Sequence, residues 1–187
     1  MRKIAVIFQG VGYTKDRPLL YYSGKIAAAF GYELVWPDFS GLVWSKEALK
    51  DPVRMEEILN VCIGRAEAAC EAKLITADDT LLFLSKSIGT VVAAAYAKKH
   101  GLPAKQIFFT PLPDMERFVE AGNGLVFYGS ADPYALPETI ARLCCENQLE
   151  AYCIDNANHS LETGRVLQDI AALERIMQKV HKHIEDI

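Results

Sequence analysis

Six short runs of apolar, β-branched and aromatic residues recur along the 187-residue chain, separated by longer stretches. The runs are almost continuously hydrophobic instead of alternating with polar residues, which is typical of strands covered on both faces. Strands that alternate with helices in this way predict a parallel sheet between two layers of helices. The six runs are KIAVIF (3–8), YELVW (32–36), TLLFLS (80–85), QIFFT (106–110), GLVFYG (124–129) and EAYCID (150–155).

Two of the separating stretches are predicted as amphipathic helices that lie on the sheet. The first begins with Asp51, which we expect to act as the N-cap, and with Pro52 at the first helical position. In the second, at the end of the sequence, apolar residues repeat at three- and four-residue steps. The predicted buried faces consist of Met55, Ile58, Leu59, Cys62, Ala66, Ala69 and Cys70 in the first helix, and of Val166, Ile170, Leu173, Met177, Val180 and Ile184 in the second.

The predicted architecture is one three-layer αβα domain over residues 1–187, of the α/β class, with six mainly parallel strands. A chain with 51% hydrophobic and 24% charged residues can bury a single core of this size. In open sheets of this class, ligands bind at the carboxyl ends of the strands. The residues that follow each run are therefore the candidates for function.

Charge and hydropathy argue against two kinds of partner. The formal net charge is -4 and no basic cluster is present, so we expect no binding to nucleic acid. No apolar run is long enough for a membrane span, and the start MRKIAVIFQG lacks the long apolar region of a secretory signal. We therefore expect a cytoplasmic protein whose partner is a small molecule.

The five cysteines favour neither a disulfide framework nor a zinc site. Their number is odd, they form no CxxC pair, and they lie in predicted helices or strands, where cysteine is usually a small hydrophobic residue. We expect free thiols and no metal. A catalytic cysteine is the alternative. The residues concerned are Cys62, Cys70, Cys144, Cys145 and Cys153.

The loop after the first run, QGVGYTKDRP (9–18), contains two glycines two positions apart. Such glycines allow a sharp turn that presents backbone N–H groups to a ligand. A dinucleotide-binding loop is one interpretation, with Asp38 as the ribose-binding acid. It is weak, because Lys15 stands where the third glycine of GxGxxG is needed, and Asp38 follows Pro37 as a turn residue would.

The third run ends in SKSIGT, which fits the pattern small-x-Ser-x-small of a nucleophile elbow. In such an elbow a strand turns abruptly into a helix, so the residues two before and two after the nucleophile must be small. Ser85 and Gly89 meet this need around Ser87. Ser85 is a rival nucleophile that would still lie within the strand. Lys86 is expected to be a solvated charge, because adjacent residues in the turn point apart and make it a poor base; binding of anionic substrates is a second hypothesis for it.

An acid and a histidine follow the fifth and sixth runs, as Asp132 in GSADPY and His159 in DNANHSLE. The order Ser, Asp, His is the chain order of a catalytic triad on a nucleophile elbow. Asp132 precedes a proline and so could be a turn residue, and Asp155 is the alternative acid. The other histidines lie in or at the ends of predicted lysine-containing helices and are expected at the surface: His100, His181 and His183.

Taken in order, the motifs QGVG (9–12), SKSIG (85–89), GSADP (129–133) and NHSLE (158–162) resemble a small α/β-hydrolase of the dienelactone-hydrolase-like kind. The resemblance extends from Ile4 to Leu161. It implies the α/β-hydrolase fold without its first two strands and without a large lid, since only PLPDMERFVEAGN lies between the fourth and fifth runs. Two positions depart from the family pattern, Ser85 at the first elbow glycine and Gln9 at the histidine of the oxyanion loop.

The resemblance implies a serine hydrolase that forms a covalent acyl-enzyme from small acyl esters or thioesters, without a cofactor. Ser87 would be the nucleophile, His159 the base and Asp132 its orienting acid. The oxyanion hole would consist of the backbone N–H groups of Val11 and Ile88. The alternatives are a catalytically inactive, hydrolase-like binding protein and the nucleotide-binding domain. The residues expected to line a small, open substrate pocket are Gly10, Gly12, Tyr13, Trp36, Leu112 and Tyr134.

Overall fold

The computed structural model describes residues 1–39, 41, 42 and 51–187, which form one sheet of six strands in the order β2-β1-β3-β4-β5-β6. Every neighbouring pair of strands is parallel. All six predicted runs are strands, with ends that agree to within one residue. The strands are β1 (Lys3–Phe8), β2 (Glu33–Val35), β3 (Thr80–Lys86), β4 (Lys105–Phe109), β5 (Leu125–Gly129) and β6 (Glu150–Ile154).

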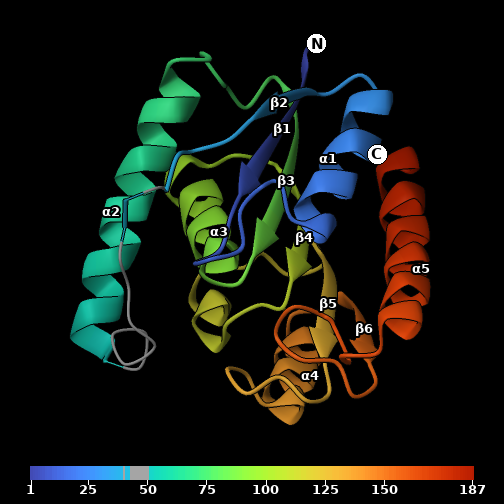
Figure 1. The fold of residues 1–187 in the computed structure, drawn as a ribbon. Helices are drawn as coiled ribbons and strands as arrows, with labels where there is room; N and C mark the ends of the chain where they lie inside the picture. Colours follow the sequence, from blue (N-terminus) through green and yellow to red (C-terminus); the bar gives the residue numbers. More distant parts are fainter. Residues whose placement is uncertain (40, 43–50) are drawn as a thin grey trace.

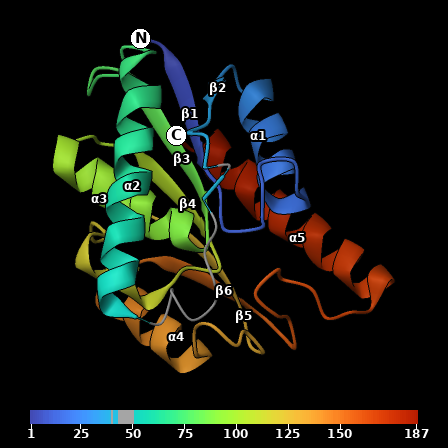
Figure 2. The same cartoon turned by 60° about the vertical axis from the view of Figure 1, so that its left-hand side comes forward.

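Helices cover both faces of the sheet, as predicted, and Figures 1 and 2 show the three layers. One face carries α1 (Pro18–Ala29) and α5 (Val166–Glu185). The other carries α2 (Pro52–Glu71), α3 (Ile88–His100) and α4 (Pro137–Glu146). Two buried clusters result, one on each face of the sheet. The α/β fold class predicted from the sequence is thus confirmed.

The strands belong to both clusters, because successive side chains of a strand point to opposite faces. In β3, Leu81 and Phe83 pack toward α2 and α3, whereas Leu82 and Leu84 pack toward α1 and α5. This double burial is the physical reason for the nearly continuous hydrophobicity of the six runs.

The α2 helix begins as expected, since the Asp51 carboxylate accepts a hydrogen bond from the Val53 N–H at 2.9 Å. The predicted face of α5 is wrong in its first turns. Val166 and Ile170 are 71% and 58% exposed. The buried residues of this helix are Ala172, Ile176, Val180 and Ile184. The amino-terminal end of α5 extends beyond the sheet, so its first apolar residues have no strand to pack on.

The connection between β4 and β5 contains the short 3-10 helix η2 (Pro113–Arg117) and no lid domain. This connection therefore adds no large element over the carboxyl ends of the strands. None of the helices in the described parts of the chain is both long and apolar enough to cross a membrane.

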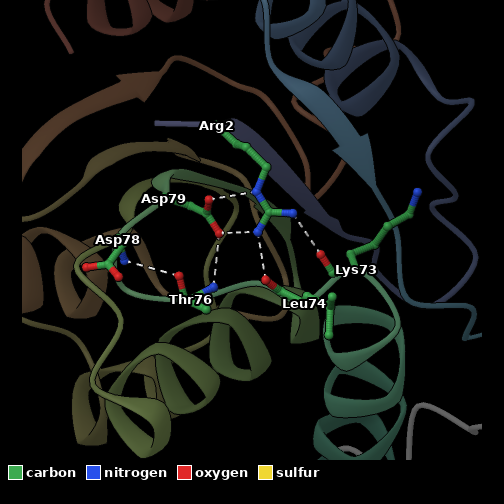
Figure 3. A network of polar contacts seen from close by, with 6 residues as sticks. All are labelled: Arg2, Lys73, Leu74, Thr76, Asp78 and Asp79. Carbon is green, nitrogen blue, oxygen red and sulfur yellow. Dashed lines mark hydrogen bonds and ion pairs between the residues drawn. The ribbon is translucent and has the colours of Figure 1, made fainter.

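A polar network ties the opposite, amino-terminal edge of the sheet together (Figure 3). The Arg2 guanidinium donates two hydrogen bonds to the Asp79 carboxylate, at 2.9 and 2.8 Å, and two more to the backbone oxygens of Lys73 and Leu74. Asp79 also accepts from the Thr76 N–H at 3.0 Å. The hydrogen bonds from Arg2 hold the pKa of Asp79 below its usual value. The starts of β1 and β3 are thereby joined to the end of α2, away from the candidate site.

Candidate active site

The turn between β3 and α3 has the geometry of a nucleophile elbow. Ser87 adopts φ 56° and ψ −125°, a strained conformation for a residue other than glycine, and its N–H donates to the Phe109 oxygen at 3.0 Å. Gly89 lets the start of α3 approach the end of β1, because a Cβ on it would lie 2.2 Å from the backbone oxygen of Phe8. The small residue expected two positions after the serine is thus required by backbone packing.

The loop after β1 lies directly against this elbow. A Cβ on Gly10 would lie 3.1 Å from the Ser87 Cβ, so only glycine fits here without displacing a neighbour. The loop folds back on itself, since the Gly10 N–H donates to the Tyr13 oxygen at 3.1 Å and the Gln9 side-chain oxygen accepts from the Lys15 N–H at 3.4 Å. Gly12 provides the turn, with φ +65°. The Gln9 side chain therefore accepts a hydrogen bond within the loop that carries it and helps to hold the folded-back shape of that loop.

The loops after β5 and β6 are packed against each other. A Cβ on Gly129 would lie 2.1 Å from the backbone oxygen of Ala157, so glycine is needed where the two loops meet. The Ala131 N–H donates to the same oxygen at 3.0 Å, and the Ser130 hydroxyl accepts from the Asn156 N–H at 2.7 Å. These contacts bring the acid-bearing and histidine-bearing loops together.

Ser87, His159 and Asp132 form one hydrogen-bonded chain. The His159 Nε2 lies 2.8 Å from the Ser87 Oγ, and its Nδ1 lies 2.7 Å from the Asp132 Oδ2. The other carboxylate oxygen, Oδ1, accepts from the Tyr134 N–H at 2.8 Å. The Asp132 side chain is only 1% exposed and that of His159 18%, and Ser87 is also buried, at 7%, so the three residues are largely shielded from bulk water.

The electrostatic setting keeps the histidine neutral. Burial lowers the pKa of His159 below its ordinary value, the hydrogen bond to Asp132 opposes this effect, and the positive charge of Lys86 adds to it. A neutral imidazole with Nδ1–H directed at Asp132 leaves Nε2 free to accept a proton from Ser87. The arrangement can therefore perform general-base catalysis on a serine hydroxyl.

The rival residues lie in other environments. Ser85 is fully buried in β3 and its hydroxyl donates to the Ile107 oxygen at 3.1 Å, so it faces the core. Asp155 is exposed, and His100 pairs with Glu67 at 2.9 Å on the surface. The structure brings together the serine, acid and histidine that the sequence motifs predict, and none of these alternatives.

The two predicted oxyanion donors belong to Ile88, which follows Ser87 directly, and to Val11, which follows Gly10 in the loop against the elbow. Within the described ranges, no residue accepts a hydrogen bond from the N–H of Val11 or of Ile88. Ile88 is the first residue of α3, where N–H groups have no partner inside the helix. Val11 is 38% exposed on the loop whose Gly10 touches Ser87. Both N–H groups are thus without an acceptor among the described residues, as the donors of an oxyanion hole must be.

Of the residues expected to line a pocket, two aromatic ones lie at the site. The Tyr134 ring is centred 4.7 Å from that of His159. Tyr13 lines a cavity of about 390 Å³ between the loop after β1, the loop that follows His159 and the start of α5. Apolar side chains provide most of its wall: Tyr13, Pro18, Leu19, Leu161, Val166, Ile170, Leu173 and Ile176.

Two other predictions for the pocket are corrected by the structure. Trp36 follows the edge strand β2, two strands away from β3, and lines a separate cavity beside α1, where its ring lies 5.0 Å from the Lys15 ammonium. Leu112 is 7% exposed and packs into the cluster under α2 and α3, because the chain turns inward before η2. Neither lines the cavity beside His159.

Lys86 is the largest departure from the sequence prediction. It is 1% exposed, and the expectation of a solvated charge is wrong. The alternation along β3 places its side chain on the same face as Leu82 and Leu84, beneath Tyr13. Sequence reasoning also missed Leu161, Val166 and Ile170 as walls of the cavity; the signal was the apolar start of the last helix, directly after the histidine loop.

The described part of the chain contains no group of three or more His, Cys, Asp or Glu side chains that could hold a metal ion. The free cysteines lie outside the candidate triad, and burial raises the pKa of Cys62 and of Cys144 to about 12.

Neither a family model nor a curated protein sequence matches the chain. Solved structures do. A protein of Xanthomonas campestris, provisionally described as a hydrolase of the alpha/beta superfamily, superposes with a TM-score of 0.70 at 13% identity, over 100% of both chains. An α/β serine hydrolase without a lid, also from Xanthomonas campestris, matches with a TM-score of 0.59 at 14% identity, over 94% of this chain and 81% of that one.

A third similar structure is Est1E from Butyrivibrio proteoclasticus with ferulic acid bound. It matches with a TM-score of 0.62 at 13% identity and covers 95% of this chain and 89% of its own. At such identities the likeness concerns the fold. The chain has the small, lidless α/β-hydrolase fold that its motifs resemble.

Proposed function

We propose that this protein is a serine hydrolase that cleaves small acyl esters or thioesters through a covalent acyl-enzyme. The single observation that carries the proposal is the hydrogen-bonded chain from the Ser87 Oγ through His159 to Asp132. The strained elbow under Ser87 and the lowered pKa of His159 support it, because both are features of an activated nucleophile.

In the proposed reaction, the Ser87 Oγ attacks the acyl carbonyl carbon while His159 Nε2 takes up the hydroxyl proton. The resulting imidazolium is stabilised by the Asp132 carboxylate, and it then donates its proton to the leaving alcohol or thiol as the bond to the acyl group breaks. Water, activated by the same imidazole, hydrolyses the acyl-enzyme and restores Ser87. The role of Tyr134 is to hold Oδ1 of Asp132 through its N–H, which directs Oδ2 at the imidazole.

The negative charge that develops on the carbonyl oxygen would be held by the N–H groups of Val11 and Ile88. Neither N–H donates to another described residue; Ile88 follows Ser87 directly, and Val11 follows Gly10, whose loop lies against the elbow. Donors that are already in place stabilise the tetrahedral intermediate without reorganisation, and each is worth roughly 10²–10³ in rate. Gly10 supports this role by allowing the loop to touch the elbow.

The proposed substrate class is based on the cavity bordered by Tyr13 and by the loop that follows His159; on that loop its lining begins at Ser160, and it includes none of the three triad residues. Its volume of about 390 Å³ fits a small acyl group or a single ring, and its wall is mainly apolar. The loops that carry Tyr13 and Leu161 border both this cavity and the candidate triad. The ferulic acid bound by Est1E, which shares the fold, agrees with a small-molecule substrate.

The test of this function is covalent labelling of the wild-type protein with a fluorophosphonate, followed by mass spectrometry of the adduct. We expect one label per chain, on Ser87, together with hydrolysis of p-nitrophenyl acetate. An adduct on another residue would overturn the elbow assignment. A folded protein that neither reacts nor hydrolyses would instead support the inactive binding protein.

Placing a charge at the rim of the cavity should change the preference for acyl length. Ile170→Glu is expected to lower kcat/KM for p-nitrophenyl hexanoate roughly tenfold, because burial of each methylene contributes about 0.8 kcal/mol. Hydrolysis of the acetate should change little, since the acetyl group does not reach the rim. Ile170 is 58% exposed, so folding should be unaffected.

The matched control is Val61→Glu, which places the same charge at a 47% exposed position of α2, on the other face of the sheet. This control should behave like the wild type with both esters. Equal losses for acetate and hexanoate in Ile170→Glu would show that the cavity does not hold the acyl chain.

A further inference from the structure

Lys86 is a buried cation that the proposed reaction does not use. The residue is 1% exposed, and its ammonium forms no hydrogen bond or ion pair with any residue in the described ranges. Burial lowers the pKa of Lys86 to about 7, against an opposing effect of the Asp132 charge. A lysine is rarely kept fully buried without such a partner, because removing its charge from water is unfavourable. Its position directly before Ser87 suggests a role in the site.

The loop that carries the oxyanion donor encloses this side chain. A Cβ on Gly10 would lie 3.5 Å from the Lys86 Cγ, so the stem passes along the loop backbone. The ammonium lies 5.0 Å from the centre of the Tyr13 ring, which covers it from the cavity. The Tyr13 hydroxyl is held by the Leu19 N–H at 3.1 Å. The face of the Tyr13 ring is a weak electrostatic partner for the ammonium and helps to fix its position.

The positive charge of Lys86 interacts electrostatically with both the acid and the base of the candidate triad. Asp132 attracts the ammonium from the loop after β5, and His159 is repelled by it from the loop after β6. The Tyr13 hydroxyl is in turn influenced by the charges of Glu162 and Arg17. The titratable and charged groups near Lys86 and His159 are therefore Asp132, Tyr134 and Tyr13, with Glu162 and Arg17 acting on Tyr13.

We propose that Lys86 is a positioning residue that acts through His159: its ammonium, buried beneath Tyr13 against the loop that touches Ser87, favours the neutral imidazole as the base of the reaction. This inference rests on the proposed function, because it concerns the base of that reaction. It assigns a role to the charge of Lys86 and not only to its stem.

The direction of the effect follows from the order of the two titrations. The pKa of Lys86 is about 7 and that of His159 lies below its ordinary value of 6.5, so the amine is charged over the range in which the imidazole takes up its proton. A second positive charge nearby disfavours imidazolium. With Lys86 present, His159 therefore remains neutral down to a lower pH than it would without Lys86. The acid limb of the pH–rate profile is accordingly shifted to lower pH.

The test compares Lys86→Met, which keeps the stem and removes the charge, with Lys86→Arg, which keeps a charge. The measurement is the pH dependence of p-nitrophenyl acetate hydrolysis and of fluorophosphonate labelling. In Lys86→Met the rate at about pH 5.5, relative to the plateau, should fall roughly threefold, because neutral imidazole is lost tenfold per pH unit below its midpoint. Lys86→Arg should retain the wild-type limb.

A matched control is Lys25→Met, which removes an exposed lysine whose ammonium lies 5.5 Å from the Tyr21 ring. Its pH profile should be that of the wild type. An acid limb in Lys86→Met that coincides with the wild-type limb would overturn the proposal, as would the same displacement in Lys25→Met. A purely structural role of Lys86 would lower the rate at all pH values equally.

Titration by NMR decides the matter independently of activity. In the wild-type protein, the side-chain signal of Lys86 should titrate near neutral pH, with a pKa of about 7, and the His159 ring below its ordinary range. A Lys86 signal that titrates at lower pH than the His159 ring would exclude the role even if Lys86→Met failed to fold, because the amine would then be uncharged while the imidazole takes up its proton. If the wild type proved inactive, the proposed function would fail, whereas an upward shift of the His159 midpoint in folded Lys86→Met would still establish the coupling.

Discussion

Replacing Ser87 with alanine is expected to lower kcat/KM for p-nitrophenyl acetate by roughly 10⁴- to 10⁶-fold, because removal of a triad nucleophile eliminates the covalent route. The substitution deletes only the Oγ that lies 2.8 Å from His159 Nε2. Alanine can follow the same backbone path as serine, and the N–H of residue 87 would still donate to Phe109. The melting temperature should therefore change little while fluorophosphonate labelling disappears.

The matched control for this variant is Ser85→Ala, at the neighbouring serine of the same strand. Ser85 is fully buried and bonds the Ile107 oxygen, so its loss should reduce stability and leave hydrolysis largely intact. The reverse outcome, an active Ser87→Ala together with an inactive but folded Ser85→Ala, would assign the nucleophile to Ser85. Comparable activity in all three proteins would point to hydrolysis without a serine nucleophile.

Asp132→Asn is expected to lower kcat roughly 10³- to 10⁴-fold, the second largest effect. The Asp132 Oδ1 accepts from the Tyr134 N–H at 2.8 Å, and an asparagine would keep its carbonyl oxygen there. Its amide NH₂ would then face His159 Nδ1, which must become an acceptor. The remaining ring proton would move to Nε2, where it prevents proton transfer from Ser87. The loss of the carboxylate also leaves the imidazolium of the transition state without its counter-charge.

Kinetics over a range of pH should distinguish this effect from unfolding. The hydrogen bond to Asp132 raises the pKa of His159, so the residual activity of Asp132→Asn should persist to lower pH than that of the wild type. The matched control is Asp155→Asn, at the exposed acid that precedes the histidine loop. It should retain wild-type kinetics. A folded Asp155→Asn that loses activity, beside a nearly normal Asp132→Asn, would identify Asp155 as the orienting acid.

Much of the architecture could be predicted from the sequence, because strands that are buried on both faces of a sheet form nearly continuous hydrophobic runs. Each of the six hydrophobic runs is a strand, and the Asp51-Pro52 start of α2 is found where predicted. The residues of the candidate triad could be predicted from the sequence for a related reason. The carboxyl ends of parallel strands share one edge, so Ser87, Asp132 and His159 had to lie near one another once the strands were placed.

The residues misjudged from the sequence depend on neighbours that lie far away in the chain. The face of Lys86 could be counted along its strand, but its burial arises from Tyr13 and Gly10 of another loop. Leu112 and Trp36 both follow strands, yet one turns into the core and the other lies at the edge of the sheet. The exposure of Ile170 arises because the first turns of α5 extend past the last strand, which periodicity cannot show.

The sequence alone thus determined the six strands, the chain order of the polar motifs that follow them, the elbow and the three residues of the candidate triad, since these depend on local pattern and on the common edge of a parallel sheet. Only the tertiary structure decided which loops touch. Its contacts placed the cavity beside His159 and buried the ammonium of Lys86 beneath Tyr13. The physical reason is that the burial of a charge and the shape of a cavity are set by packing between segments distant in sequence, which no local pattern encodes.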